Sequence, residues 1–161
     1  MASENVLKGK KILIVDDEPD VLATLEELLA ICDVKKAHSF EEAVEQLESE
    51  YFDIAILDIM GVNGYRLLEI AKEIGVIPVM LTAHALSIDD TIKSYKEGAA
   101  YYVPKEKMTH IITYLNDILE AKSKGKSLWW RWFERFGAFY SRQFGNEWKD
   151  KDKEFWDMFP Y

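Results

Sequence analysis

Cysteine is almost absent from this sequence, which has a single one, Cys32, among 161 residues. One cysteine cannot form an internal disulfide, and Cys32 belongs to no metal-binding spacing. Because it ends an apolar helical pattern over residues 21–29, we predict that it is a small buried core residue. The sequence therefore excludes an internally disulfide-linked fold and a cysteine-ligated metal centre.

Long apolar runs are also lacking, since none approaches the roughly 20 residues that a membrane-spanning helix needs. Residues 1–5 do not show the basic and then apolar pattern of a secretory signal. Hydrophobic residues nevertheless make up 48% of the chain, which is enough for a core. We therefore expect a soluble globular protein that resides in the cytoplasm.

Positive charge is scarce in most of the chain and is concentrated near its C-terminus. Residues 1–121 contain 11 Lys and Arg against 23 Asp and Glu, whereas residues 122–161 contain 9 against 6. An acidic surface repels nucleic acid. We therefore expect no nucleic-acid partner for the first 121 residues.

Residues 1–121 alternate five predicted strands with five predicted helices. The strands are expected at residues 11–15, 33–37, 53–57, 77–81 and 100–103. The helices are expected at residues 18–31, 39–49, 64–74, 87–97 and 107–121. Ser39 and Ser87 each have an acid three residues later and are predicted helix N-caps, while Gly75 and Gly98 end helices. Short continuous apolar strands are typical of a parallel sheet with helices on both faces, so the sequence predicts a doubly wound α/β fold.

Carboxylates stand where two of these strands end. Asp16 and Asp17 follow the first strand, and Asp58 follows the third. If the two strands are parallel neighbours, all three acids meet at the carboxyl edge of the sheet, where doubly wound folds bind ligands. Like charges at one point raise each other's pKa and repel unless a cation intervenes. Oxygen ligands alone suit Mg²⁺, so we predict a magnesium site.

A hydroxyl and an ammonium are expected at the same edge. Thr82 ends the fourth strand and Lys105 follows the fifth. Together with a metal, these groups can hold one phosphoryl group from several sides. Asp58, at the centre of the set, would then be the nucleophile.

This ordered set of strand-end residues resembles the receiver domain of two-component response regulators. The residues that establish the resemblance are Asp16, Asp17, Asp58, Thr82, Ala83 and Lys105, within about residues 9–121. The resemblance implies a flavodoxin-like five-stranded receiver fold in which Asp58 accepts a phosphoryl group from a histidine kinase or phosphotransfer protein. It also implies Mg²⁺ held by Asp17, Asp58 and a backbone carbonyl near Met60, with Asp16 acting mostly through a metal-bound water.

The resemblance further implies a conformational switch. Lys105 would pair with the phosphoryl group, Thr82 would swing toward it, and Tyr102 would move inward as Thr82 vacates its space. The surface formed by residues 87–97, 100–103 and 107–121 would then change its partner preference.

Three features depart from the usual pattern of the family. The loop after Asp58 reaches Gly64 two residues early, and we expect Gly61 and Gly64 to supply positive φ angles there. Proline precedes Lys105 instead of following it, so we expect either a trans Lys105–Glu106 bond with a re-aimed lysine or stored strain. His84, two residues after Thr82, is a candidate modulator of how fast water attacks the phosphoryl group.

The C-terminal segment is unusually aromatic. We divide the chain into a receiver domain (1–121), a linker (122–127) and a helical tail (128–161). The tail contains 13 of the 21 aromatic residues. Five of them recur at three- and four-residue steps, as on an amphipathic helix: Trp129, Trp132, Phe133, Phe136 and Tyr140.

Several roles for the tail stay open at this point. We favour contact with a downstream protein partner or self-association, because aromatic side chains flanked by arginine are typical of interface hot spots. Packing on the chain's own receiver domain is the next alternative. Membrane contact is less favoured because the second half of the tail is acidic, and DNA binding is disfavoured because the tail has too few helices for a reader domain.

Two functions from different classes follow from the sequence. The first is a single-domain response regulator that signals by protein–protein contact, without a DNA-binding output domain and without enzymatic activity beyond gaining and losing its own phosphoryl group. The second is a phosphorylation-independent adaptor, in which the receiver scaffold presents the aromatic tail to a partner or membrane.

Overall fold

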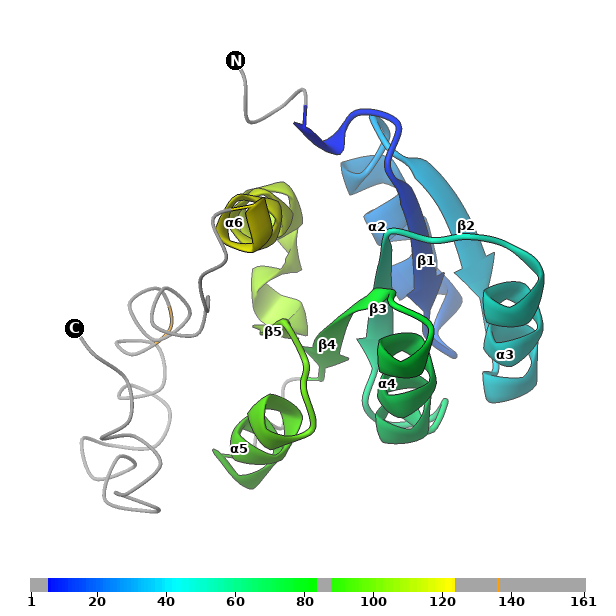
Figure 1. The fold of residues 1–161 in the computed structure, drawn as a ribbon, viewed down its shortest axis with the longest axis vertical. Coiled ribbons are helices and arrows are strands. Elements are labelled where there is room, and N and C mark those ends of the chain that lie inside the picture. Colours follow the sequence, from blue (N-terminus) through cyan, green and yellow to red (C-terminus); the bar gives the residue numbers. More distant parts are fainter. Residues whose placement is uncertain (1–5, 84–87, 124–135, 137–161) are drawn as a thin grey trace.

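The computed structural model describes residues 6–83, 88–123 and 136. These residues form a five-stranded parallel sheet with helices on both faces (Figure 1). The strands are β1 (Lys11–Val15), β2 (Asp33–Ala37), β3 (Ile54–Asp58), β4 (Ile77–Thr82) and β5 (Tyr101–Pro104). The helices are α2 (Pro19–Leu28), α3 (Phe40–Ser49), α4 (Gly64–Glu73), α5 (Ile88–Lys96), the 3-10 helix η1 (Lys105–His110) and α6 (Ile111–Ser123). The predicted doubly wound α/β fold is confirmed.

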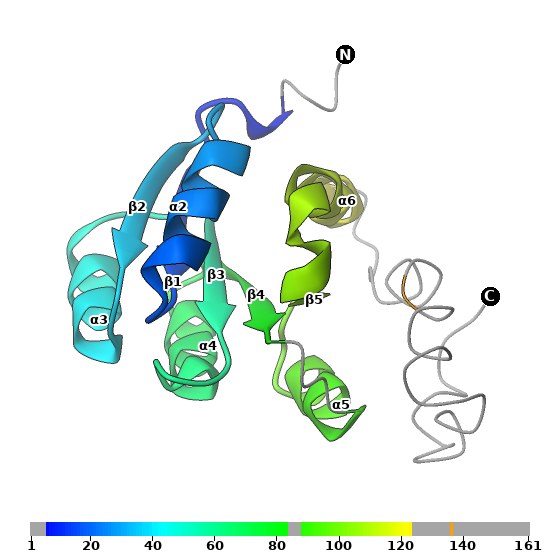
Figure 2. The same cartoon turned by 180° about the vertical axis from the view of Figure 1, so that it is seen from behind.

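The helices cover the two faces of the sheet unequally. Opposite views show α3, α4 and α5 on one face and α2 and α6 on the other (Figures 1 and 2). The core lies between the sheet and these two layers, where every residue of β3 is buried. Within the part of the chain that the structure describes, no helix is both long and apolar enough to cross a membrane.

The order of the strands determines where the carboxyl edge of the sheet can bind a ligand. The order is β2-β1-β3-β4-β5, with every neighbouring pair parallel. Connections from β1 therefore lead first to β2 on one side and then to β3 on the other. The crevice at such a reversal, outside the carboxyl ends of the strands, is the usual ligand site of an open α/β sheet.

Several predicted boundaries are confirmed by hydrogen bonds. The Ser39 hydroxyl caps α3 by accepting a hydrogen bond from the Glu42 backbone N–H at 3.2 Å. The Glu42 carboxylate in turn accepts one from the backbone N–H of His38, one residue before the expected donor of a capping box. Gly75 and Gly98 both have positive φ angles directly after helices. The predicted cap Ser87 lies outside the described residues.

Two helix boundaries differ from the prediction. The first helix ends at Leu28 instead of residue 31, because the Ile31 carbonyl accepts a hydrogen bond from the Gly9 backbone N–H and the chain turns there into β2. The last helix begins as the 3-10 helix η1, directly after β5. Cys32, predicted to be a buried core residue, is only partly buried and packs against the core from outside, where its thiol donates a hydrogen bond to the Leu7 carbonyl at 3.4 Å.

Candidate functional site

Asp16 and Asp58 meet at the reversal point of the sheet. Val15 of β1 pairs with Leu57 of β3, so the residues that follow, Asp16 and Asp58, leave adjacent strands side by side. Both are buried, with exposed fractions of 0% and 4%. Ionised carboxylates are rarely buried without a charged partner, so the site requires a cation.

Lys105 supplies one positive charge to this pair. Its Nζ lies 2.9 Å from Asp16 Oδ2 and 3.4 Å from Asp58 Oδ1, and its side chain is only 13% exposed. It also donates a hydrogen bond to Glu18 Oε1 at 2.9 Å. No cis peptide bond occurs in the described residues, so the Lys105–Glu106 bond is trans. Despite the preceding Pro104, the ammonium thus reaches both buried acids.

The surroundings of Asp58 raise the pKa of its carboxyl group into the neutral pH range. Burial, followed by the neighbouring Asp16 carboxylate, raises the pKa of Asp58 to about 7, although Lys105 opposes the shift. Burial likewise raises the pKa of Asp16. Burial disfavours the Lys105 ammonium, yet Asp16 and Glu18 raise the pKa of Lys105 overall, so it stays charged. A carboxylate with a pKa near neutrality, beside a permanent cation, is suited to act as a nucleophile.

The donor set at this edge fits Mg²⁺. Oxygens of Asp16, Asp17 and Glu18 lie within 4.8 Å of one another. The Lys105 ammonium lies 2.9 Å from Asp16 Oδ2, and a carboxylate oxygen has a second lone pair that can face a further cation or its water. Met60, whose backbone carbonyl is the expected ligand, lies on the loop after β3 and is 72% exposed. Carboxylates with a nearby carbonyl are the ligands that Mg²⁺ prefers.

Gly61 allows Asp17 to lie over the β3–α4 loop. Its φ angle is +82°, as predicted, and a Cβ atom there would stand 2.6 Å from Asp17 Oδ2. The prediction for Gly64 is wrong, because Asn63 adopts the left-handed conformation instead, with φ of 55°. Gly64 instead permits a close backbone approach, since a Cβ on it would stand 2.2 Å from the Asp58 carbonyl oxygen. The shortened loop therefore passes directly against the Asp58 backbone.

Thr82 is the last residue of β4, and Tyr102 lies within β5. Thr82 is 6% exposed, and its hydroxyl donates a long hydrogen bond to the Ala83 carbonyl at 3.5 Å. Tyr102 is fully buried. Both side chains are therefore buried together in this structure. Register places Thr82 one residue past Leu81, the partner of Asp58, whereas Tyr102 pairs with Met80 on the edge strand β5.

Other predicted residues fall largely outside the described part of the chain. This is the case for His84, Trp129, Trp132, Phe133 and Tyr140. Phe136 is described, and it is buried, with its ring 5.4 Å from the ring of Tyr114. Glu18 is the site residue that sequence reasoning missed. The available signal was its place directly after the acid pair, because a third acid at that turn can face the same cation.

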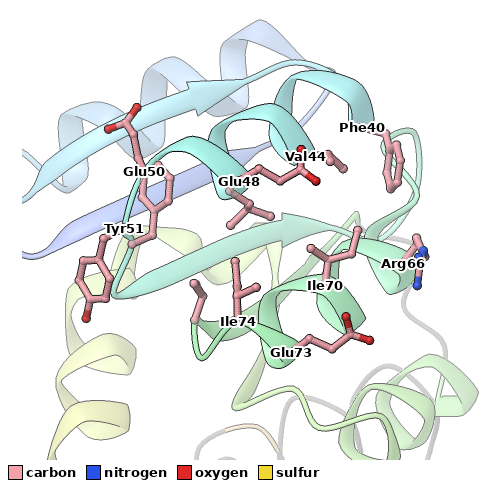
Figure 3. Close-up of a pocket in the computed structure, with 12 residues that line it drawn as sticks. Phe40, Val44, Glu48, Glu50, Tyr51, Arg66, Ile70, Glu73 and Ile74 are labelled. Carbon is pink, nitrogen blue, oxygen red and sulfur yellow. The ribbon is translucent and has the colours of Figure 1, made fainter.

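A hollow among the described residues lies away from the acids. It is a groove of about 900 Å³ between α3 and α4, on the face of the sheet that these helices cover (Figure 3). Phe40, Val44 and Ile70 line it, and Glu48 and Glu73 stand at its sides. It shares no residue with the site at Asp58.

Comparisons with known proteins match the part of the chain that contains Asp16, Asp58 and Lys105. The family model described as the response regulator receiver domain matches residues 12–116. The curated protein "Two-component response regulator ARR18" of Arabidopsis thaliana is 38% identical over 103 residues, which are 60% of this chain and 16% of that protein. The chain spans about half or less of the length of such curated relatives.

Solved structures are similar over the same part of the chain. A putative response regulator from Chloroflexus aurantiacus has 31% identity and a TM-score of 0.63, covering 70% of this chain and 99% of that one. The DrrB receiver domain of Thermotoga maritima, described as BeF3-activated, has 28% identity and a TM-score of 0.61, covering 70% and 98%. Sequence, fold and comparisons thus agree on residues 12–116.

Proposed function

Because this chain belongs to the response regulator receiver domain family, we propose that it is a signalling switch that accepts a phosphoryl group on Asp58. The observation that supports this most strongly is the position of the Asp58 carboxylate, which is buried beside Asp16 and 3.4 Å from the Lys105 ammonium. The phosphoryl donor would be a histidine kinase or a phosphotransfer protein, as the family implies.

In the proposed reaction, an oxygen of ionised Asp58 attacks the phosphorus of the donor's phosphohistidine. The bond between phosphorus and the imidazole nitrogen breaks, and its electron pair leaves with the imidazole. Lys105 holds a phosphoryl oxygen with its ammonium, and the Thr82 hydroxyl donates a hydrogen bond to another. Both groups stand at neighbouring strand ends, at the edge of the sheet where Asp58 lies.

The site would also hold Mg²⁺ through Asp17, Asp58 and a carbonyl near Met60, with Asp16 acting through a metal-bound water. When bound, the ion would neutralise negative charge on the oxygens of the phosphoryl group. Asp17 can serve as a metal ligand because Gly61 has no side chain and so leaves room for the Asp17 carboxylate. The Lys105 ammonium does not balance Asp16, Asp58 and an incoming phosphoryl group by itself.

We further propose that these 161 residues signal by contact with a protein partner and not by binding DNA. The net charge of −9 disfavours nucleic acid. The partner surface would be that of α5, β5 and α6, since β5 leads directly into Lys105.

Binding of beryllofluoride, a phosphoryl mimic, tests the proposed acceptor. The protein is titrated with beryllofluoride and Mg²⁺, and bound fluoride is followed by fluorine NMR. We expect bound signals for wild type and for Asp33→Asn, which changes an exposed acid on β2. Asp58→Asn should show none. Absence of binding to wild type would instead favour the adaptor function.

A further inference from the structure

The hollow between α3 and α4, which we call the α3–α4 groove, exposes apolar side chains that the proposed switch does not use. Its buried lining residues are Leu47, Phe52 and Val76. Five large hydrophobic residues are exposed in the described part of the chain, and two of them, Tyr51 and Ile74, line this groove with exposed fractions of 68% and 52%. Exposed apolar side chains gathered over a buried apolar surface are typical of a binding site.

The α3–α4 groove follows the direction of the two helices. Figure 3 shows Phe40 and Arg66 near one end and Tyr51 near the other, with Val44 and Ile70 on the two walls. Helix α3 has 10 residues and is therefore about 15 Å long, which is close to three helical turns. A hollow of this length between two helices can receive the apolar stripe of a third helix.

The charged residues of the groove leave it acidic. Two of them are neutralised by ion pairs, which are Arg66 with Glu69 and Glu50 with Lys11. Glu48 of α3 and Glu73 of α4 are exposed and have no ion-pair partner among the described residues. They stand on opposite sides of the groove (Figure 3). Two unpaired carboxylates therefore flank the apolar surface.

The composition of the two helices strengthens this acidic character. Helix α3 has four glutamates and no lysine or arginine. In α4, Arg66 is already paired, and the Lys72 ammonium donates a hydrogen bond to the Glu97 carbonyl at 2.9 Å. Neither basic residue of α4 thus pairs with Glu48 or Glu73. The groove attracts a cationic partner and repels an anionic one.

We infer that the α3–α4 groove binds an amphipathic helix of a protein partner. The apolar side chains of that helix lie between α3 and α4, and its lysine or arginine side chains pair with Glu48 and Glu73. An acidic peptide or an anionic lipid surface is disfavoured, because the two carboxylates repel it. The groove shares no residue with the site at Asp58, so the inference does not rest on the proposed function. It adds an interaction surface separate from that of α5, β5 and α6.

A synthetic peptide tests the groove on the full chain. The probe is a fluorescein-labelled amphipathic helix of about twelve residues, with leucine and tryptophan on one face and lysine and arginine along its flanks. Binding is measured by fluorescence anisotropy at about 0.15 M salt, where charges more than about 8 Å apart are largely screened. We expect the full chain to bind this peptide. A counterpart with glutamate at every basic position should bind at least about tenfold more weakly.

Charge reversal in the groove separates docking from general attraction to an acidic protein. We expect the double variant with Glu48→Lys and Glu73→Lys to bind the basic peptide at least about tenfold more weakly than wild type. The matched control combines Glu27→Lys with Asp33→Lys, which makes the same change in net charge at exposed acids outside the groove. For this control we expect a change of less than about twofold.

The apolar part of the contact is tested separately. Ile74→Ala removes a half-exposed side chain from the groove, and we expect it to weaken binding of the basic peptide about fivefold. The control is Ile31→Ala, at a residue that is 44% exposed and lies outside the groove, for which we expect the wild-type affinity. Thermal unfolding followed by circular dichroism checks that every variant is folded.

Several outcomes of these measurements overturn the inference. Absence of binding to the full chain, or equal affinity for the basic and acidic peptides, would contradict it. Equal weakening in the groove variants and their controls would mean attraction without a defined site. A dimer seen by analytical ultracentrifugation that dissociates on reversal of Glu48 and Glu73 would assign the groove to a second copy of the chain, which contradicts a separate partner.

Discussion

The Lys105 ammonium lies 2.9 Å from the Asp16 carboxylate, and this ion pair joins the residue after β5 to the residue after β1. The two strands are separated in the sheet by β3 and β4. The side chain of Lys105 therefore crosses the carboxyl edge of the sheet and passes Asp58 on its way. Charge balance at Asp58 thus depends on a residue from the far side of the site.

Removal of Lys105 should destabilise the protein. In Lys105→Gln, buried Asp16 and Asp58 lose the ammonium that contacts both of them, and we expect the free energy of unfolding at pH 8 to fall by about 2 kcal/mol. Urea unfolding with a chelator present measures the change. Lys35→Gln, at an exposed lysine of β2, is the control, with an expected change below about 0.5 kcal/mol. Equal stability of the two variants would contradict the role given to Lys105.

Removal of the Asp58 charge should have the opposite effect. Because burial and Asp16 raise its pKa from 3.8 to about 7, ionised Asp58 destabilises the metal-free fold above neutral pH. Asp58→Asn should therefore raise the free energy of unfolding at pH 8 by about 2–4 kcal/mol.

The pH dependence of this gain has a defined sign. Between pH 4 and about 7, folded Asp58 binds more protons than unfolded Asp58, so its contribution makes wild type less stable as pH rises. The gain from Asp58→Asn should be nearly complete above pH 8 and should shrink toward pH 4. Urea unfolding of both proteins across this range, in chelator, measures it. A gain that grows on acidification would contradict the raised pKa.

Substitution of Gly64 should destabilise the protein although the residue begins a helix. A helical Gly→Ala change ordinarily stabilises by about 1 kcal/mol. At Gly64 the added Cβ would stand 2.2 Å from the Asp58 carbonyl oxygen. We expect Gly64→Ala to lower the free energy of unfolding by about 3 kcal/mol and to weaken beryllofluoride binding.

Gly75→Ala is the control for this effect. Gly75 has a φ angle of +82°, and a Cβ added there would meet no atom within 4 Å, so only backbone strain of about 1–2 kcal/mol is expected. Chemical denaturation compares the two variants. A smaller loss for Gly64→Ala than for Gly75→Ala would show that the loop does not need the close approach to Asp58.

Metal binding should depend on Asp17. Asp17→Asn removes one charged ligand, and we expect at least about tenfold weaker Mg²⁺ binding by calorimetry. Asp20→Asn, an exposed acid in the first turn of α2, should bind Mg²⁺ as wild type does. Mg²⁺ should also raise the midpoint of wild-type thermal unfolding, and a chelator should reverse this. Unchanged affinity in Asp17→Asn would exclude it as a ligand.

The meeting of Asp16 and Asp58 could be predicted because both residues stand where strands end. Asp16 and Asp58 come directly after apolar runs, and parallel pairing of β1 with β3 brings any two such residues together. The same rule places Thr82 and Lys105 at the edge. This logic uses only periodicity and chain order, which are fully present in the sequence.

The remaining features depend on contacts that no local pattern specifies. The sequence does not show whether Asn63 or Gly64 takes the left-handed conformation, because that depends on how closely the loop approaches Asp58. The ion pair of Glu18 with Lys105 joins two distant chain segments. The ring contacts of Phe136 with Tyr101 and Tyr114 are equally non-local, because they join residues far apart in the chain.

The most direct test of the account is phosphoryl transfer to the protein itself. Wild type and Asp58→Asn are incubated with acetyl phosphate and Mg²⁺, and intact masses are measured by mass spectrometry with and without chelator. The account predicts one added phosphoryl group on wild type, dependent on Mg²⁺, and none on Asp58→Asn. An unmodified wild type, or equal modification of both proteins, would contradict the assignment of Asp58 as the acceptor.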